Sequence, residues 1–337
     1  MPRFPLPDLS VEGILAGLRS AVSGIEFASF EVGVSSASTD DKAKARVSSI
    51  SFLSGAMGKK HDANNFDLYL IVYLDRGFVE ATPQPLHIYG RYNKFSREVA
   101  QTFHYCFRCR GRGRGCRQCK GTGKLSDNSV QEILEKIFIP AFEAKESKFH
   151  GCGREDVDVR MLGNGRPFVL ELVEPKKRSA DLDALEKNVN STFGEMAAVH
   201  GLRFSSKSEV EKIKNAEFSK VYSCLCLAGG IMPEEAVKKL AGRKIEIAQR
   251  TPERVEKRRA DKERVKQAEI TSAVPLSGTE FRLEIRSSHG LYVKEFISGD
   301  NGRTRPSISE LLGVPCRCKE LDVLEIVLPG ENGVSGK

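Results

Sequence analysis

One segment near the middle of the chain concentrates residues that could act as a nucleophile. Residues 151–168 place three carboxylates and three arginines within thirteen positions, from Arg154 to Arg166. Gly153 favours a loop that brings Asp156 close to a substrate, and the flanking arginines favour the ionised carboxylate. An ionised aspartate suits nucleophilic attack better than proton donation. A surface cluster of salt bridges explains the same residues, so the pattern by itself leaves both interpretations open.

Alternation along this segment predicts where its side chains point. If the backbone is extended, Asp156, Asp158 and Arg160 share one strand face. Glu155 then points to the opposite face. The neighbouring carboxylates Glu155 and Asp156 are therefore expected to meet different surroundings.

A second cluster consists of cysteines spaced for a metal. Two Cys-x-x-Cys pairs, separated by six residues, are formed by Cys106, Cys109, Cys116 and Cys119. Each pair curls into a turn that directs two thiolates at one point, and two such turns complete a tetrahedral zinc site. A four-cysteine site leaves no coordination position open, so the predicted zinc is structural. Four thiols without a metal are the alternative.

The same cysteine segment is strongly basic, with no acidic residue between Cys106 and Lys124. Its seven cations are Arg108, Arg110, Arg112, Arg114, Arg117, Lys120 and Lys124. Some of them balance the negative thiolates, and the surplus fits contact with RNA phosphates. A solvated charged loop is the alternative.

A repeated Cys-x-x-Cys-x-Gly-x-Gly unit in this segment resembles the zinc region of DnaJ-type co-chaperones. Those proteins carry more copies of the unit and a helical module with the sequence His-Pro-Asp. His-Pro-Asp does not occur in this chain. A zinc co-chaperone is therefore a disfavoured alternative.

The composition indicates a globular chain. Its 337 residues predict two domains, because single cores rarely grow past ~250 residues. Hydrophobic residues make up 40% and charged residues 29%, which excludes a disordered chain. The net charge of +8 favours a polyanionic partner, although a basic soluble protein without one is equally consistent.

No apolar stretch approaches the ~18 residues of a membrane span. The first 20 residues lack the basic start and apolar run of a signal peptide, so a cytoplasmic (intracellular) location is expected. In such a reducing compartment, the nine cysteines favour metal binding or packing over disulfides.

The N-terminal part is expected to form a small α/β module. A helix is predicted over residues 10–20 and a buried strand over residues 66–74. A second strand, at residues 86–90, follows a Pro-Gln-Pro break, and the polar residues 35–45 are expected to form a loop. This part contains neither a glycine-rich phosphate loop nor a Cys/His cluster, so the chemistry is expected elsewhere.

Beyond the cysteines, the pattern predicts an α+β domain with a mixed or antiparallel sheet. Ser129 to Glu132 have the spacing of a capping box, so a helix starts there, and Pro140 is expected to end or kink it. Strands are then expected at residues 166–173, 218–227, 281–285 and 321–328, and helices at 181–189, 234–240 and 307–312.

The carboxylate segment carries a family resemblance. Gly153-Arg154-Glu155-Asp156 resembles the Gly-Arg-x-Asp element with the catalytic aspartate of several pseudouridine synthase families. With residues 162–167 included, it is similar to the archaeal and eukaryotic tRNA pseudouridine synthases that modify uridines 54 and 55 of the TΨC arm. Further similar segments follow in the same order, at residues 91–97, 249–255, 258–261, 292–296 and 302–306.

The resemblance implies a division of the chain and a reaction. Residues 1–105 would form an RNA-binding domain with a THUMP unit, residues 106–124 the zinc segment, and residues 125–337 the catalytic domain. The reaction would be isomerisation of uridine to pseudouridine at position 55, or at both 54 and 55. The resemblance implies a monomer that binds tRNA and does not bind a membrane. It also implies a structural zinc ion and no cofactor for catalysis.

The resemblance also implies roles for individual residues. Asp156 would attack the nucleotide at the sugar C1′ of a flipped-out base. Tyr222 would stack on the uracil and help to remove the C5 proton, although its pattern equally fits a core tyrosine. Lys294 would pair with the aspartate. The expected substrate-binding residues are Arg154, Tyr222, Arg254, Arg258, Arg259 and the apolar Leu312, which would pack under the site.

Residues 250–266 hold eight basic and four acidic residues, a balance that permits a solvated helix. The resemblance implies instead an extended segment across the active-site face. Thr251-Pro252 favours a break at that point.

Two further alternatives stay open. The first is a non-catalytic tRNA-binding protein or RNA chaperone with the same fold, which the joint presence of Asp156, Tyr222 and Lys294 disfavours. The second is a THUMP-linked methyltransferase or thiolation enzyme. Neither a glycine-rich cofactor loop nor a P-loop occurs, which disfavours the second.

Overall fold

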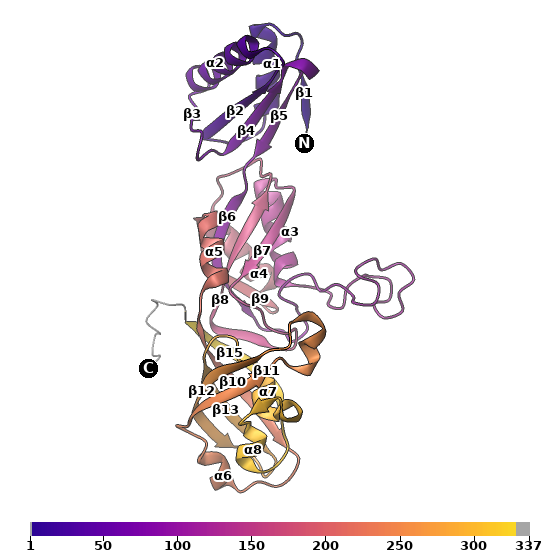
Figure 1. Cartoon of the computed structure of the whole chain (residues 1–337), viewed down its shortest axis with the longest axis vertical. Coiled ribbons are helices and arrows are strands. Elements are labelled where there is room, and N and C mark those ends of the chain that lie inside the picture. The colour runs from indigo at the N-terminus through magenta and orange to yellow at the C-terminus, as the bar shows by residue number, and fades with distance from the viewer. Residues whose placement is uncertain (1, 328–337) are drawn as a thin grey trace.

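The computed structural model describes residues 2–327, apart from the side chains of residues 257 and 258. Two sheets follow each other along the longest axis, with the N-terminal sheet at one end (Figure 1). Each sheet has its own hydrophobic core. No helix in the described part of the chain is long and apolar enough to cross a membrane.

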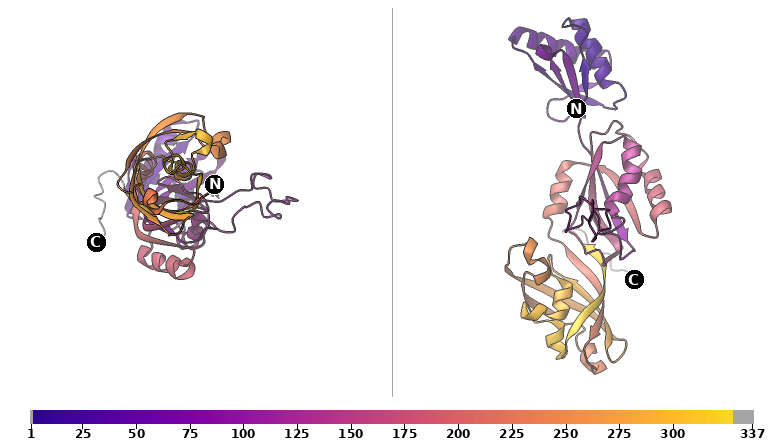
Figure 2. Two further views of the ribbon diagram at one scale, coloured as in Figure 1. Left: turned by 90° about the horizontal axis from the view of Figure 1, so that it is seen from below. Right: turned by 90° about the vertical axis from the view of Figure 1, so that its right-hand side faces the viewer.

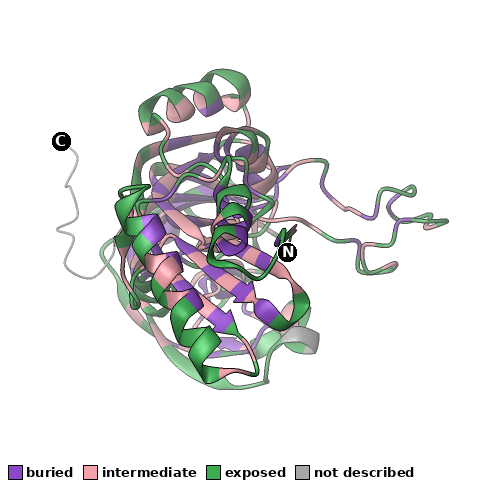
Figure 3. Cartoon of the chain, turned by 90° about the horizontal axis from the view of Figure 1, so that it is seen from above, coloured by how far each residue is buried: buried purple, intermediate pink, exposed green. Residues whose placement is uncertain are grey.

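The N-terminal unit is a five-stranded sheet with the strand order β1-β5-β4-β2-β3. Its strands are β1 (Arg3–Pro5), β2 (Ser29–Ser35), β3 (Lys60–His61), β4 (Leu68–Tyr73) and β5 (Phe78–Pro83). Two helices, α1 (Val11–Val22) and α2 (Thr39–Gly55), complete its core, and η1 (Leu74–Arg76) is a single turn. Buried and partly exposed residues alternate along these strands, as the burial colours of Figure 3 show.

Capping residues explain where these helices begin. The Ser10 side chain accepts a hydrogen bond from the Gly13 amide at 3.1 Å, so the helix predicted over residues 10–20 is confirmed. The loop predicted over residues 35–45 is wrong beyond Ser38. Ser38 caps the Asp41 amide at 3.2 Å, and the acidic first turn of α2 favours a helix start there.

The larger sheet has ten strands in the order β14-β11-β12-β13-β10-β15-β8-β6-β9, with β7 paired to β8. The strands are β6 (Leu86–Lys94), β7 (Glu146–Gly151), β8 (Arg160–Val173), β9 (Ala197–Ser205), β10 (Ser219–Ala228), β11 (Lys244–Arg250), β12 (Glu263–Pro275), β13 (Glu280–Ser287), β14 (Thr304–Arg305) and β15 (Cys316–Val327). The α+β class with a mixed sheet is therefore confirmed.

A short parallel pairing joins two halves of this sheet. Between β8 and β15 only two registers are paired, Asp322 with Arg160 and Val323 with Met161. The other strand pairs of this sheet are antiparallel. One half therefore contains β6 to β9, and the other contains β10 to β15.

The helices of this part are α3 (Val130–Phe142), α4 (Leu182–Phe193), α5 (Lys207–Asn215), α6 (Glu234–Lys238), α7 (Val293–Ser298) and α8 (Ile308–Leu312), with the 3-10 turns η2 (Glu253–Arg258) and η3 (Asp300–Gly302). The capped start of α3 at Ser129 is confirmed, and the helix runs two residues past Pro140. A helix over residues 250–266 is not formed, because η2 is followed by β12 from Glu263.

The structure divides the chain at slightly different residues from those expected, both between the two sheets and around the cysteine segment. Strand β6 lies inside residues 1–105 but pairs with β8 and β9 in the larger sheet, so the two sheets separate between Pro83 and Leu86. Between β6 and α3, residues 104–125 form an arm that projects away from the body in Figure 1 and in the left view of Figure 2. We call this segment the cysteine arm.

Candidate active site

The loop of residues 152–159, here called the Asp156 loop, connects β7 to β8 at the junction of the two sheet halves. Gly153 has a φ of +75°, and a Cβ there would lie 3.0 Å from the Phe218 ring and 3.1 Å from Arg166. Glycine is thus needed for both conformation and space. The strand expected across residues 156–160 is wrong, because β8 starts only at Arg160.

A buried ion pair anchors the loop from below. Glu155 and Arg166 are both buried, and Arg166 Nε lies 2.8 Å from Glu155 Oε2. The Tyr92 hydroxyl donates to the same carboxylate at 2.9 Å. Glu155 is therefore buried while Asp156 is exposed, so the two carboxylates meet different surroundings as expected, although the backbone between them is not a strand.

Further cations hold the backbone of the Asp156 loop. Lys94 donates to the carbonyl of Val157 at 2.6 Å, and Arg97 donates to the carbonyl of Asp158 at 2.8 Å. Burial lowers the pKa of Lys94 to about 8, against the opposing charge of Glu155. Bonds to consecutive carbonyls fix the path of the loop, so the Asp156 carboxylate is held in place before any ligand binds.

Asp156 faces a cavity of about 610 Å³. Its nearest cation is Arg254, with Nη1 at 3.0 Å from Asp156 Oδ2, and Lys294 Nζ lies 3.6 Å from the same oxygen. Asp156 therefore stays accessible while two cations from the other half of the sheet balance its charge.

Lys294 is shared between two carboxylates. Its Nζ donates to Asp158 at 2.9 Å and 2.8 Å, closer than its contact with Asp156. Burial alone would raise the pKa of Asp158, but the hydrogen bond and charge of Lys294 outweigh it and lower that pKa. The expected pairing of Lys294 with Asp156 thus forms, as the weaker of two contacts.

Arg254 is held by a second acidic residue. Its Nε donates to buried Glu295 at 2.6 Å, and its guanidinium lies 5.9 Å from the Tyr292 ring centre. Burial would lower the pKa of Arg254, but Glu295 outweighs this effect and raises it. Glu295 thereby fixes the guanidinium that reaches Asp156.

The residues that follow β11 are tied down over the same face. Arg303 donates to the Thr251 carbonyl at 2.7 Å and contacts Asp261 at 3.0 Å. Gln249 donates to the Tyr292 carbonyl at 3.0 Å and accepts from the Tyr292 amide at 2.8 Å. This network positions η2, and with it Arg254, over the cavity.

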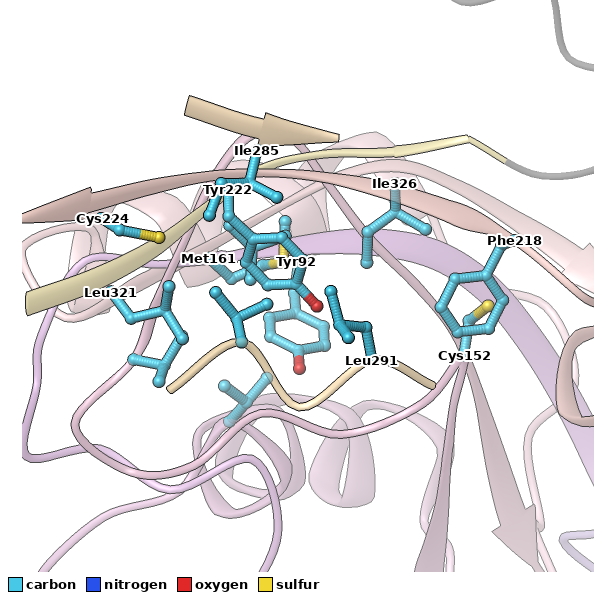
Figure 4. Packing of buried hydrophobic residues seen from close by; sticks show 14 of the residues in the cluster. Tyr92, Cys152, Met161, Phe218, Tyr222, Cys224, Ile285, Leu291, Leu321 and Ile326 are labelled. Atoms are coloured by element: carbon cyan, nitrogen blue, oxygen red, sulfur yellow. The ribbon is translucent and has the colours of Figure 1, made fainter. Parts of the chain in front are cut away.

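The aromatic residues Phe218, Tyr222 and Tyr292 are among those that line the cavity. Tyr222 is 6% exposed and lies in the hydrophobic cluster with Ile285, Leu291 and Leu321 (Figure 4). Burial raises the pKa of Tyr222, so its phenol stays protonated at neutral pH. The Lys220 amine lies 6.0 Å from the Tyr222 ring centre, and burial lowers its pKa to about 7, assisted by the charge of Arg166.

A family profile described as Pus10, C-terminal, matches residues 87–327. This chain belongs to that family. The matched range starts at β6 and ends with β15, so it coincides with the larger sheet.

Two archaeal relatives illustrate the similarity. A tRNA pseudouridine synthase Pus10 from Methanothrix thermoacetophila is 44% identical over 270 residues, which cover 80% of this chain and 59% of that protein. The protein of the same name from Methanothermobacter marburgensis is 45% identical over 272 residues, covering 80% of this chain and 66% of that protein. This chain therefore matches less than two thirds of their length.

Among solved structures, one chain of a Cbf5-Nop10-Gar1 complex is 18% identical, with a TM-score of 0.35. The match covers 58% of this chain and 44% of that chain. A likeness of this degree establishes neither a shared fold nor a shared role.

Within the Pus10 C-terminal fold of this chain, most predicted site residues meet at one cavity. The lining includes Asp156, Tyr222, Lys294, Arg154, Arg254 and Arg259. Leu312 ends α8, packs against the core, and is not among the lining residues. The apolar lining includes Leu291, Val293, Leu321 and Val323 instead. The side chain of Arg258 lies outside the described residues.

Several site residues were not anticipated as such. Lys220 and Glu295 are the clearest, one lining the cavity and one holding Arg254. Lys220 stands two positions before Tyr222 on β10, so strand alternation could have placed both on one face. Glu295 follows Lys294 directly in the sequence, but no local signal indicates that it pairs with Arg254.

The four cysteines of the cysteine arm do come together. Their sulfurs lie within 4.8 Å of one another, with 3.8 Å between Cys106 and Cys116 and 3.7 Å between Cys109 and Cys119. A tetrahedral ion with sulfur ligands at about 2.3 Å spaces those ligands about 3.8 Å apart. The Gly113 amide donates to Cys109 Sγ at 3.3 Å. The donor set therefore fits a four-coordinate Zn²⁺.

Proposed function

We propose that this chain isomerises uridine to pseudouridine in tRNA, with Asp156 as the nucleophile. The observation that carries the proposal is the contrast between two adjacent carboxylates. Both line the cavity of about 610 Å³, but Glu155 is buried against Arg166, whereas Asp156 is exposed with Arg254 at 3.0 Å and Lys294 at 3.6 Å. The name of the Pus10 relatives supports the same reaction class.

The proposed chemistry conserves all atoms of the substrate. A carboxylate oxygen of Asp156 bonds to the sugar C1′ while the N1–C1′ bond breaks, and uracil leaves with the electron pair on N1. After the base turns, C5 bonds to C1′ and displaces the carboxylate. N1 takes up a proton and C5 loses one, so no cofactor is consumed.

We propose that Arg254 and Lys294 act together at two stages of this reaction. Both lie within ion-pair distance of the Asp156 carboxylate before attack. When the leaving uracil carries negative charge, the same cations can stabilise it, because charges that are already fixed in position need little reorganisation. Arg154 lines the cavity and has no acidic partner among residues 2–327, so it is suited to hold a phosphate of the flipped nucleotide.

The aromatic lining of the cavity suits the flipped base. We propose that Tyr222 stacks on uracil, a contact worth about 1–3 kcal/mol per base. Because burial raises its pKa, the phenol is a poor proton acceptor at neutral pH. Lys220, with a pKa lowered to about 7, is the better acceptor for the C5 proton.

The proposed substrate is the TΨC arm of tRNA, with modification at position 55 or at both 54 and 55. The +8 net charge and the arginines around the cavity support an RNA substrate. We propose further that the chain acts as a monomer, that the N-terminal unit is a THUMP-containing RNA-binding domain, and that the cysteine arm holds a structural zinc ion.

The test compares two neighbouring carboxylates. Wild type, Asp156→Asn and Asp158→Asn are incubated with unmodified tRNA, and pseudouridine is mapped along the TΨC arm. We expect no product from Asp156→Asn, and slower but detectable product from Asp158→Asn, which removes a partner of Lys294. Product from Asp156→Asn at the wild-type rate would refute the nucleophile assignment. Product only outside the TΨC arm would refute the proposed substrate.

A further inference from the structure

The cysteine arm is a separate structure that the proposed reaction does not use. At its base the Cys106 amide donates to the Gly123 carbonyl at 2.7 Å, and the Leu125 amide donates to the His104 carbonyl at 2.9 Å. Beyond this pairing the arm leaves the body, as Figures 1 and 2 show. Among the residues that line the cavity, only His104 belongs to the arm.

The arm exposes an aromatic ring. Phe107, inside the first Cys-x-x-Cys turn, is 73% exposed, the highest value for any Phe or Tyr of the described chain. Tyr105, next to the same turn, is 61% exposed. Phe107 lies between Cys106 and Cys109, whose clustered sulfurs fit a structural zinc ion, and such an ion would present the ring on a rigid turn.

Exposed cations follow Phe107 along the same arm. The arm residues Arg108, Arg110, Arg112, Arg114, Arg117 and Lys120 are all exposed. Between residues 2 and 327, no carboxylate lies within ion-pair distance of any of these six. Four thiolates on a divalent ion carry a charge of about −2, so the six cations leave a surplus of about +4.

The exposed Phe107 ring and the six cations of the arm together fit a single-stranded nucleic acid best. A phosphate-rich strand satisfies the arginines, and an unpaired base offers a flat face to the phenyl ring. An acidic peptide would satisfy the arginines but would leave the ring in water. We infer that Phe107 is a base-stacking residue, and that the cysteine arm binds an unpaired nucleotide of the RNA at a second site. This inference rests on the proposed function for the identity of the RNA.

The absence of tryptophan from the chain allows a direct test. Phe107→Trp introduces a single indole on the arm, and Ile231→Trp introduces a control at a position that is 85% exposed and outside the cavity lining. We expect unmodified tRNA to quench the Phe107→Trp fluorescence strongly and the Ile231→Trp fluorescence little. Chelation of the metal should abolish the difference. Equal quenching of the two variants would overturn the inference.

A base and a charge can be told apart with two polyanions. Polyphosphate and poly-glutamate carry negative charge without bases, so we expect them to leave the Phe107→Trp emission nearly unchanged at ionic strength matched to the tRNA titration. If either polyanion quenched the fluorescence as strongly as tRNA does, the arm would respond to negative charge alone, and base stacking would be refuted.

Affinity separates this inference from the proposed function. Phe107→Ala should weaken tRNA binding by about 5- to 150-fold, the range that stacking of one base contributes, while Phe107→Tyr keeps it. In turnover the loss should appear in KM with kcat unchanged. Unchanged affinity of Phe107→Ala, with pseudouridine still formed, would refute the arm and leave the reaction standing. Weakened affinity without pseudouridine from wild type would do the reverse.

Discussion

The Asp156 loop and the cysteine arm are both irregular segments, yet they are held in opposite ways. The loop is fixed by buried charged side chains from β6 and β8, including Lys94 and Arg166. The arm has almost no hydrophobic interior and is held by four clustered sulfurs. One segment therefore depends on the folded body, whereas the other depends on a local donor set that fits a metal.

An exposed candidate nucleophile such as Asp156 can be held rigidly only through neighbouring residues that are anchored in the core. Asp156 must be solvent-accessible, so it cannot be immobilised by its own burial. Its neighbour Glu155 is buried in its place, and the backbone transmits the constraint. The cysteine arm has no such requirement, because its exposed side chains need only a fixed mount.

The largest effect is expected from breaking the buried ion pair. Glu155→Ala leaves Arg166 as an uncompensated buried charge and should lower the free energy of unfolding of the larger domain by about 3–5 kcal/mol. Urea unfolding followed by circular dichroism measures this loss. Exposed Glu246→Ala is the control and should change the free energy by less than about 0.5 kcal/mol. Similar values for the two variants would mean that the pair does not anchor the loop.

The next effect tests the link between Glu295 and Arg254. Glu295→Gln replaces an ionic hydrogen bond of 2.6 Å by a neutral one, so Arg254 is less firmly held against Asp156. Under the proposed function, kcat should fall about 10- to 100-fold, the equivalent of one charge-assisted hydrogen bond, with little change in tRNA affinity. A fall in affinity without a fall in kcat would contradict this positioning role.

The pH dependence offers a smaller effect. With a pKa of about 7, Lys220 is protonated below that value and neutral above it. If the neutral amine accepts the C5 proton, the single-turnover rate should rise through pH 7 and then level off. In Lys220→Gln the rate should be lower and lack this inflection. An inflection near pH 7 that survives in Lys220→Gln belongs to another group.

Removal of the metal is expected to have the smallest effect on the stability of the larger domain. Chelation should free the cysteine arm, so that trypsin cleaves after its exposed arginines, while the unfolding of the larger domain changes by less than about 1 kcal/mol. Gel analysis of cleavage and urea unfolding, done on the same sample, measure both. Cys119→Ser should behave as the chelated protein does. A large loss of stability in the body would show that the arm and the loop are not independent.

The sequence by itself determined what local spacing encodes. The cysteines lie within fourteen positions, from Cys106 to Cys119, so their turns alone bring the sulfurs together. Helix starts at Ser10 and Ser129 depend on side chains three residues from their partners. The burial of Glu155 beside an exposed Asp156 matches the expectation, but the strand that this expectation assumed is wrong, so local spacing did not determine it.

Only the tertiary structure decided which charges meet Asp156. Arg254 is 98 residues away from it, and Lys294 is 136 residues away from Asp158. The pairing of β8 with β15 brings these segments together, and no periodicity in either strand encodes that register. Leu312 shows the same limit of sequence reasoning. Its apolar character predicts that it packs against the core, but does not indicate whether it also faces the cavity. Contacts between distant segments depend on how whole sheets pair, so they were fixed by the fold and not by local pattern.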